Sequence, residues 1–151
     1  MTSTPITIRR FTAEDDATWL AKRVALWAEE DHAELAREIV GLAAREDFAA
    51  FGAMTGNGRC VGFVEVGERS YAEGCTSSPV GYVEGLWVDE DVRLQGIARR
   101  LMETAADWSR SRGYREMASD TNLDNTDSQK MHARLGFAET DRIVTFLITL
   151  D

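Results

Sequence analysis

The segment from residue 80 to residue 108 constrains the fold most, because an apolar run passes into an amphipathic stretch through a turn with one glycine. The run Val80–Val88 predicts a strand. Ile97–Trp108 has the apolar spacing of a helix, and Gly113 follows its end. Gly96 lies in the turn between them. A strand that leads directly into a helix favours a domain in which helices cover a sheet.

Hydrophobic periodicity predicts further elements on both sides of this segment. The other expected strands are Ile6–Phe11, Phe48–Met54, Cys60–Val66, Glu116–Ser119 and Ile143–Leu150. The other expected helices begin near Asp15, carry the stripe Leu35, Ile39, Leu42 and Ala43, and span Thr126–Leu135 before Gly136. Asn57-Gly58 predicts a tight turn that joins two of the strands as a hairpin. This order favours one α/β or α+β domain over residues 1–151, with a mixed, mostly antiparallel sheet.

Charge and composition exclude several classes of function. The chain carries 26 acidic against 17 basic residues, a net charge of −9, which disfavours nucleic acid as a partner. A cleft lined with carboxylates in such a protein would attract a polycation. Cys60 and Cys75 lie in no metal or redox motif, so we expect free thiols and no metal. No apolar run could span a membrane, and residues 1–16 lack the apolar core of a signal peptide, which predicts a cytoplasmic protein without a membrane partner.

The turn before residue 97 has the features of an anion site. Backbone N–H groups at a helix N-terminus favour phosphate or pyrophosphate, and Gly96 allows close approach. Arg93, Arg99 and Arg100 add positive charge. Alternatively, Gly96 only starts a helix and the arginines form a solvated face, since the glycines of a dinucleotide fingerprint and the Gly-Lys of a P-loop are absent. The residues alone leave both interpretations open.

Two motifs of the chain stand in a fixed order: Arg93-Leu94-Gln95-Gly96-Ile97-Ala98, and later Asn125-Thr126-Asp127-Ser128 followed by Leu135-Gly136-Phe137. The first is similar to the Arg/Gln-x-x-Gly-x-Gly/Ala motif of the GNAT superfamily of acetyl-CoA-dependent N-acetyltransferases. The second resembles the late helix of that superfamily. The resemblance implies the GNAT fold, with about four helices around the sheet, and acetyl-CoA as co-substrate.

Shorter stretches carry a second resemblance: Leu26-Trp27, Tyr71, Ser77-Ser78-Pro79, Glu84-Gly85, Met117-Ala118-Ser119-Asp120, and Gly136-Phe137 with Thr140 and Arg142. Together they are similar to one group within this superfamily, the bacterial aminoglycoside 6′-N-acetyltransferases. Members tend to carry Trp-Pro-x-His after the first helix, whereas this chain has Trp27-Ala28-Glu29-Glu30. The resemblance implies a homodimer that confers antibiotic resistance by moving acetyl from acetyl-CoA to the 6′-amine in a ternary complex, without an acetyl-enzyme.

The resemblance also implies a cofactor site. The strand segment Leu86-Trp87-Val88 is expected to splay from its neighbour and leave backbone groups for the pantetheine arm. The Val88 N–H is then the expected oxyanion donor. The turn residues are expected to hold the pyrophosphate, and Asn125 to contact the pantetheine arm. The expected cofactor-binding turn comprises Arg93, Leu94, Gln95, Gly96, Ile97, Ala98 and Arg99.

For the acceptor, ammonium groups require carboxylates and aromatic faces. Positions matched by the resemblance supply them, with Glu30 in place of the usual His: Trp27, Glu30, Tyr71, Glu84, Asp120 and Asp141. Glu84 is expected to orient the reacting amine or to accept its proton through water, and Asp120 to face the same cleft. His132 occupies the helical position where many GNAT enzymes have a tyrosine that protonates the thiolate.

Structural roles compete with these assignments. Trp27 also fits a core position on its helix, and His132 fits a structural position on a helix face. Tyr71 could cap the hairpin, and Asp120 could cap a turn. Glu84 lies inside an apolar strand and therefore needs a partner or a cleft. Two other functions stay open: a GNAT enzyme for another small amine or a peptide N-terminus, and a non-catalytic CoA-binding sensor.

Overall fold

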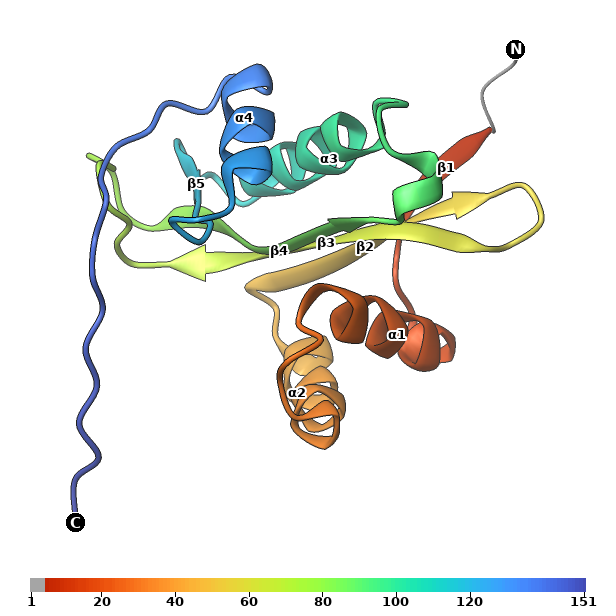
Figure 1. Cartoon of the computed structure of the whole chain (residues 1–151), viewed down its shortest axis with the longest axis horizontal. Helices are drawn as coiled ribbons and strands as arrows, with labels where there is room; N and C mark the ends of the chain where they lie inside the picture. The colour runs from red at the N-terminus through yellow and green to blue at the C-terminus, as the bar shows by residue number, and fades with distance from the viewer. Residues whose placement is uncertain (1–4) are drawn as a thin grey trace. The chain divides into compact units, whose positions relative to one another are not determined.

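A five-stranded sheet in the order β1-β2-β3-β4-β5 forms the centre of the chain's first part (Figure 1). Its strands are β1 (Ile6–Arg10), β2 (Phe48–Thr55), β3 (Cys60–Arg69), β4 (Val80–Val88) and β5 (Met117–Ser119). The first four pair antiparallel, and β5 runs parallel to β4. This confirms the mixed, mostly antiparallel sheet, and Gly58 in the β2–β3 turn has a φ of 87°.

The computed structural model describes residues 5–151. The first four residues of the stretch 1–16, which was considered above as a signal peptide, lie outside the described residues. The described chain forms two units, Met1–Ser119 and Asp120–Asp151, and each is treated by itself. It contains four α-helices: α1 (Asp16–Leu26), α2 (His32–Ala44), α3 (Ile97–Ser111) and α4 (Thr126–Arg134). Two short 3-10 turns, Ala13–Asp15 and Glu90–Val92, precede α1 and α3.

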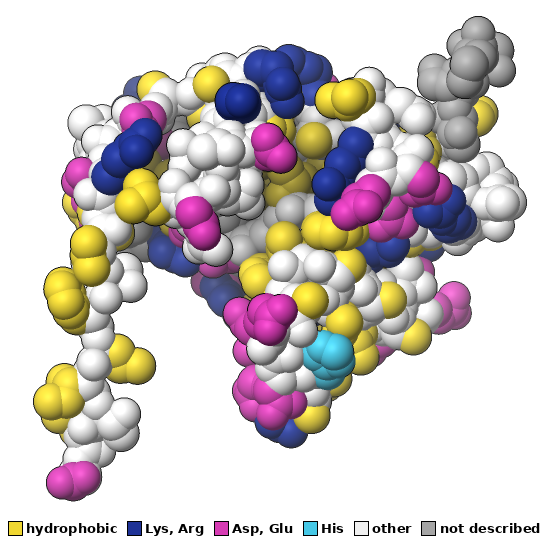
Figure 2. Space-filling view, in the orientation of Figure 1, with side chains coloured by type: hydrophobic (Ala, Val, Ile, Leu, Met, Phe, Trp, Pro, Cys, Tyr) yellow, Lys and Arg dark blue, Asp and Glu magenta, His cyan; other side chains and the backbone are white. Residues whose placement is uncertain are grey.

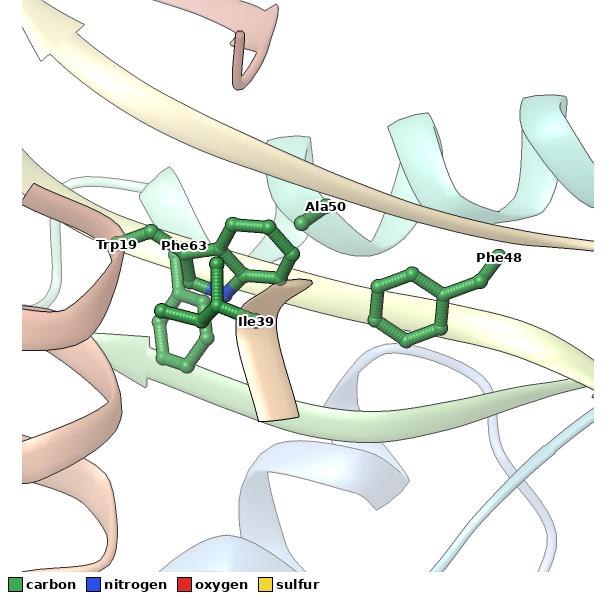
Figure 3. Packing of buried hydrophobic residues seen from close by; sticks show 5 residues of the cluster. All are labelled: Trp19, Ile39, Phe48, Ala50 and Phe63. Carbon is green, nitrogen blue, oxygen red and sulfur yellow. The ribbon is translucent and has the colours of Figure 1, made fainter. Parts of the chain in front are cut away.

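In the first unit, helices cover both faces of the sheet (Figure 1). Helices α1 and α2 lie on one face, and α3 lies on the other, where it packs against β2, β3 and β4. Between α1, α2 and the sheet lies an apolar cluster (Figure 3) formed by Trp19, Ile39, Phe48, Ala50 and Phe63. Burial of such side chains contributes about 1.5–3 kcal/mol each and holds both helices against the strands.

Strand β4 contains a β-bulge at Glu84. In the register of β3 with β4, Gly85 pairs with Glu65 and Val83 pairs with Val66, so Glu84 is an extra residue with no counterpart. A bulge breaks the alternation of a strand and redirects the side chain of the inserted residue. Glu84 is accordingly the one exposed residue in a strand that is otherwise buried or half-buried.

The far edge of β4 is open beyond this bulge. The pairing of β4 with β5 covers Gly81 to Val83 and ends at the Val83–Ser119 pair. From Glu84 to Val88, therefore, β4 has no strand on its β5 side in the described part of the first unit. The ladder stops because β5 itself ends at Ser119, so the expected splaying of the segment Leu86-Trp87-Val88 stays a prediction.

The second unit contains α4 and an extended C-terminal segment. Asn125 caps the helix by accepting a hydrogen bond from the Ser128 N–H at 3.1 Å, and Gly136 follows its end. The predicted final strand, Ile143–Leu150, is wrong: among residues 120–151 no strand forms. The apolar pattern is present, but a strand also needs a neighbouring strand for its N–H and C=O groups, and this unit supplies none.

Candidate active site

A pocket of about 420 Å³ lies in the first unit, on the side of the sheet that α1 and α2 cover. Four glutamates and two arginines line it, which gives it a surplus of negative charge. Its lining is Arg23, Trp27, Glu30, Glu38, Leu42, Arg45, Phe48, Glu65, Gly67 and Glu84. The structure thus brings together three expected acceptor residues, Trp27, Glu30 and Glu84. Acidic side chains also gather on the visible surface of α2 (Figure 2).

Glu84 has both a partner and a cleft, as its place in an apolar strand requires. Its two carboxylate oxygens accept hydrogen bonds from Nε and Nη2 of Arg69, each at 2.8 Å. The Arg69 guanidinium lies 3.6 Å from the centroid of the Tyr82 ring. The side chain of Glu84 is 34% exposed, so the paired carboxylate still faces the pocket and solvent.

Trp27 caps the C-terminus of α1 and packs directly on β4. A Cβ atom at Gly85 would lie 2.8 Å from the Trp27 ring, so the glycine makes room for the indole. The ring stands edge-on to Phe63 at 6.4 Å, and the guanidinium of Arg23 lies 4.9 Å from its centroid. Trp27 is half-buried and also lines the pocket. Its core position and its place in the pocket are therefore compatible.

A buried ion pair, Arg23 with Glu65, forms the floor of the pocket. The two side chains are 3% and 2% exposed, and Nη1 of Arg23 donates to both Glu65 oxygens at 2.8 and 2.6 Å. Trp19 Nε1 donates to the same carboxylate at 2.8 Å, and Arg23 also pairs with Glu38. Burial raises the pKa of the Glu65 carboxyl group, and the positive charge of Arg23 opposes that shift.

Sequence reasoning missed this pair, although a signal existed. Arg23 interrupts the apolar stripe of its helix, and Glu65 interrupts an apolar strand. A charge at a core position needs an opposite charge at another, because an unpaired buried charge is costly. Two such interruptions in elements that pack together would have predicted the pair.

The remaining expected acceptor and acid residues lie outside this lining. Tyr71 is 62% exposed, and its hydroxyl donates to Glu73 at 3.1 Å. Asp120, His132 and Asp141 belong to the second unit. There, His132 Nδ1 lies 2.8 Å from the Ser128 carbonyl oxygen, and its ring is edge-on to Phe137 at 5.1 Å. Asp141 is exposed and accepts from the backbone N–H of its neighbour Arg142 at 2.8 Å.

The turn between β4 and α3 is shaped by Arg93. Its Nε donates to the Val88 carbonyl at 2.9 Å, and its guanidinium lies 4.9 Å from the Trp87 ring. Trp87 Nε1 in turn donates to Asp89 at 2.9 Å, which Lys22 of α1 contacts at 2.9 and 3.0 Å. Arg93 thus contacts the end of β4, and its expected place in the cofactor-binding turn stays a prediction.

Gly96 is required for its backbone angle. Its φ is +80°, a region that side-chain-bearing residues adopt at a cost, while a Cβ there would meet nothing within 4 Å. Leu94 has a φ of +65° and is 95% exposed. Helix α3 has no acidic residue in its first turn, and Arg99 and Arg100 are exposed there. Backbone N–H groups at such a terminus suit a pyrophosphate.

Other site types find no support in residues 5–151. No cluster of three or more His, Cys, Asp or Glu side chains suits a metal ion in that range. None of the helices described there is long and apolar enough to cross a membrane. Both cysteines are free, and burial raises the pKa of the Cys60 thiol, which makes it a poor nucleophile at neutral pH.

Residues 9–137 match the acetyltransferase (GNAT) family, and the chain belongs to this family. It is 46% identical over 136 residues to the aminoglycoside N(6')-acetyltransferase type 1 of Serratia marcescens, covering 87% of this chain and 91% of that protein. The Stenotrophomonas maltophilia protein of the same name is 36% identical, covering 96% and 94%.

Solved structures of related enzymes share the fold. Aminoglycoside N-acetyltransferase AAC(6')-Iy in complex with CoA has a TM-score of 0.93 and 33% identity, covering 99% of this chain and 98% of that one. The same enzyme in complex with the bisubstrate analogue CoA-S-monomethyl-acetylneamine has a TM-score of 0.93 and 33% identity, covering 97% and 100%. The family resemblance and the GNAT fold expected from the sequence are confirmed.

Proposed function

We propose that this protein is an aminoglycoside 6′-N-acetyltransferase that uses acetyl-CoA and confers resistance to these antibiotics. One structural observation carries the proposal. The bulge turns Glu84 into a carboxylate-rich pocket, and two residues later the same strand presents an open edge at Leu86-Trp87-Val88. An acceptor amine and a thioester therefore meet along one strand. The homologues named as 6′-acetyltransferases support this substrate class.

The first unit has the residues that acetyl-CoA requires. The open edge of β4 offers backbone groups to the pantetheine arm, with the Val88 N–H as donor to the thioester oxygen. The turn from Leu94 to Arg99 and the first N–H groups of α3 hold the pyrophosphate. Roles for the second-unit residues Asp120, Asn125, His132 and Asp141 stay predictions drawn from the resemblance.

The reaction is a direct transfer. The neutral 6′-amine attacks the thioester carbonyl carbon, the new C–N bond forms, and the C–S bond breaks to release the CoA thiolate. The attacking nitrogen loses one proton, and the thiolate gains one to leave as CoA thiol. Glu84 orients the amine and accepts its proton through water, and His132 is the predicted acid for the thiolate.

The pocket suits a substrate with several ammonium groups. Glu30 and Glu38 add carboxylates to the same pocket as Glu84, and the Trp27 ring in its lining is an aromatic surface for a cation. Glu65 adds little to this attraction, because Arg23 neutralises it. The acceptor site therefore draws on carboxylates from the loop after α1 (Glu30), from α2 (Glu38) and from β4 (Glu84), of which Glu38 also pairs with Arg23 and Glu84 with Arg69.

The assembly and location follow from the same proposal. We expect a homodimer, which is supported by the exposed apolar side chains of the C-terminal segment, since a second copy would remove them from water. These side chains are Ile143, Val144, Phe146, Leu147, Ile148 and Leu150, 58–93% exposed. Acetyl-CoA is an intracellular metabolite, which supports the expected cytoplasmic location.

The decisive experiment measures thiol release from acetyl-CoA with neamine, paromamine and spermidine. Neamine and paromamine differ only in a 6′-amine against a 6′-hydroxyl. We expect release with neamine and none with paromamine. Release with spermidine but not neamine would favour an enzyme for another small amine. Binding of acetyl-CoA without release from any acceptor would favour a CoA sensor.

A further inference from the structure

The acceptor carboxylate is held by a chain of contacts that the expected reaction does not use. Tyr82 of β4 is a buried ring, 7% exposed, and therefore a fixed platform. Arg69, the last residue of β3, lies over that ring at 3.6 Å and is 44% exposed. From there its guanidinium reaches both oxygens of Glu84.

This geometry fixes the direction of the carboxylate. A two-pronged guanidinium–carboxylate contact sets the plane of the carboxyl group, which a single ammonium does not. Glu84 needs such a constraint, since it is the extra residue of the bulge and is one-third exposed. Each oxygen keeps a further lone pair for the substrate.

The guanidinium also offsets the charge of Glu84. An isolated carboxylate favours the ammonium form of a nearby amine, which binds tightly but has no lone pair for attack. A permanent cation beside the carboxylate reduces that preference. Arg69 therefore weakens binding of the unreactive ammonium form of the substrate and increases the fraction of bound amine that is neutral and can attack.

We propose that Arg69 is a positioning residue for acetyl transfer, acting through Glu84. The inference rests on the proposed function and adds a residue that has no role in the mechanism described above. If Arg69 is removed, we expect kcat to fall while KM for the aminoglycoside does not rise. The unpaired Glu84 carboxylate still binds the ammonium form of the substrate, but it does so in more orientations, few of which allow transfer.

The test is a double-mutant cycle with neamine as acceptor. The variants are Arg69→Met, which keeps a long apolar stem over Tyr82, Glu84→Gln, and the two combined. Arg69→Lys keeps the charge but loses the two-pronged contact. The matched control is Arg110→Met on α3, which removes a cation from an exposed ion pair with Asp107, 71% and 77% exposed. Thermal unfolding confirms that each variant is folded.

We expect Arg69→Met to lower kcat about tenfold with KM unchanged or lower, and Arg69→Lys to recover part of the loss. The combined variant should fall no further than Glu84→Gln alone, because the arginine then has nothing to position. Arg110→Met should match the wild type.

Three results would overturn the inference: wild-type kcat in Arg69→Met, a KM that rises while kcat holds, or losses that multiply in the combined variant. A wild-type protein that binds acetyl-CoA but releases no thiol with neamine would overturn the proposed function as well. If the wild-type protein turns over neamine normally and the variants give any of the three results, only the role of Arg69 is refuted.

Discussion

The carboxylate-lined pocket and the turn before α3, which we propose as the acceptor and cofactor sites, both adjoin β4, yet they are built from different groups. The carboxylates of the pocket are held by arginines, the buried Arg23 on Glu65 and the half-exposed Arg69 on Glu84. The turn consists of backbone, with Gly96 setting its direction and Arg93 bracing it. Side chains change with a single substitution, whereas a backbone arrangement changes only with the local fold. Substrate preference can therefore vary while the cofactor site stays constant.

The largest expected effect is on stability, at the pocket floor. Arg23→Met leaves the buried Glu65 carboxylate without its cation, and we expect a loss of about 3–5 kcal/mol in the free energy of unfolding. Urea denaturation measures it. The loss should shrink as the pH falls towards 4, because protonation neutralises a carboxyl group whose pKa is raised in the folded state.

The control for that loss replaces both charges. Arg23→Met combined with Glu65→Leu should recover most of the stability, since an apolar pair of similar volume needs no desolvation of charge. If the single and combined variants lose equally, the ion pair is not the cause, and packing of Arg23 against Trp27 becomes the explanation.

The next effect separates the two regions by function. Glu84→Ala should lower kcat about 100-fold, since orientation and proton acceptance act only during transfer, and leave the Kd for acetyl-CoA unchanged. Asp120→Ala is expected to behave alike. Steady-state kinetics with neamine and calorimetry with acetyl-CoA measure the two quantities. Equal turnover in both variants and the wild type would remove the roles assigned to these carboxylates.

A substitution in the turn between β4 and α3 should have the opposite effect, a change in acetyl-CoA affinity without a change in kcat. Gly96→Ala forces a side-chain-bearing residue to a φ of +80°, which costs about 1 kcal/mol, so we expect acetyl-CoA affinity to fall about fivefold. The kcat at saturating acetyl-CoA should change little. Gly58→Ala in the β2–β3 turn is the matched control, because Gly58 also has a positive φ, +87°, and a Cβ there also meets nothing within 4 Å. Loss of affinity in both variants would contradict a specific role for Gly96.

The smallest effect tests whether an ion pair contributes less to stability when one of its two partners is exposed to solvent. Arg9, 43% exposed, donates to Asp15 at 2.8 and 3.0 Å and holds the pKa of that carboxyl group well below its usual range. Asp15→Asn should cost about 1 kcal/mol at pH 7. A carboxylate with a lowered pKa stabilises the fold above about pH 4 and loses that effect in more acidic solution. Denaturation at pH 7 and pH 3 should therefore show the difference narrowing.

Much of the first unit was predictable because its elements depend on local pattern. The limits of β4 and the start of α3 match the apolar run and the glycine turn, and the hairpin follows from Asn57-Gly58. The absence of the expected final strand, Ile143–Leu150, could not be predicted in this way, since the formation of a strand depends on a pairing partner as well as on its own residues. Local pattern gives an element's type, whereas pairing decides whether a strand forms.

The site was predictable only in part. Motif positions placed Trp27, Glu30 and Glu84 in one pocket, but Arg69 and Arg23 were missed. Their roles depend on which side chains meet across the sheet and from helix to strand, and on a bulge that no periodicity reveals. Residue types indicated the chemistry, and the tertiary contacts decided which charges stay available to a substrate.

The bulge has one further consequence. Since Val83 pairs with Val66 and Gly85 with Glu65, a chain one codon shorter at Glu84 would join β3 to β4 in unbroken register. The sheet is therefore complete without the carboxylate that we propose for the acceptor site. A single in-frame insertion is enough to supply that group, and a single in-frame deletion is enough to remove it, while every other side chain of the strand keeps its face.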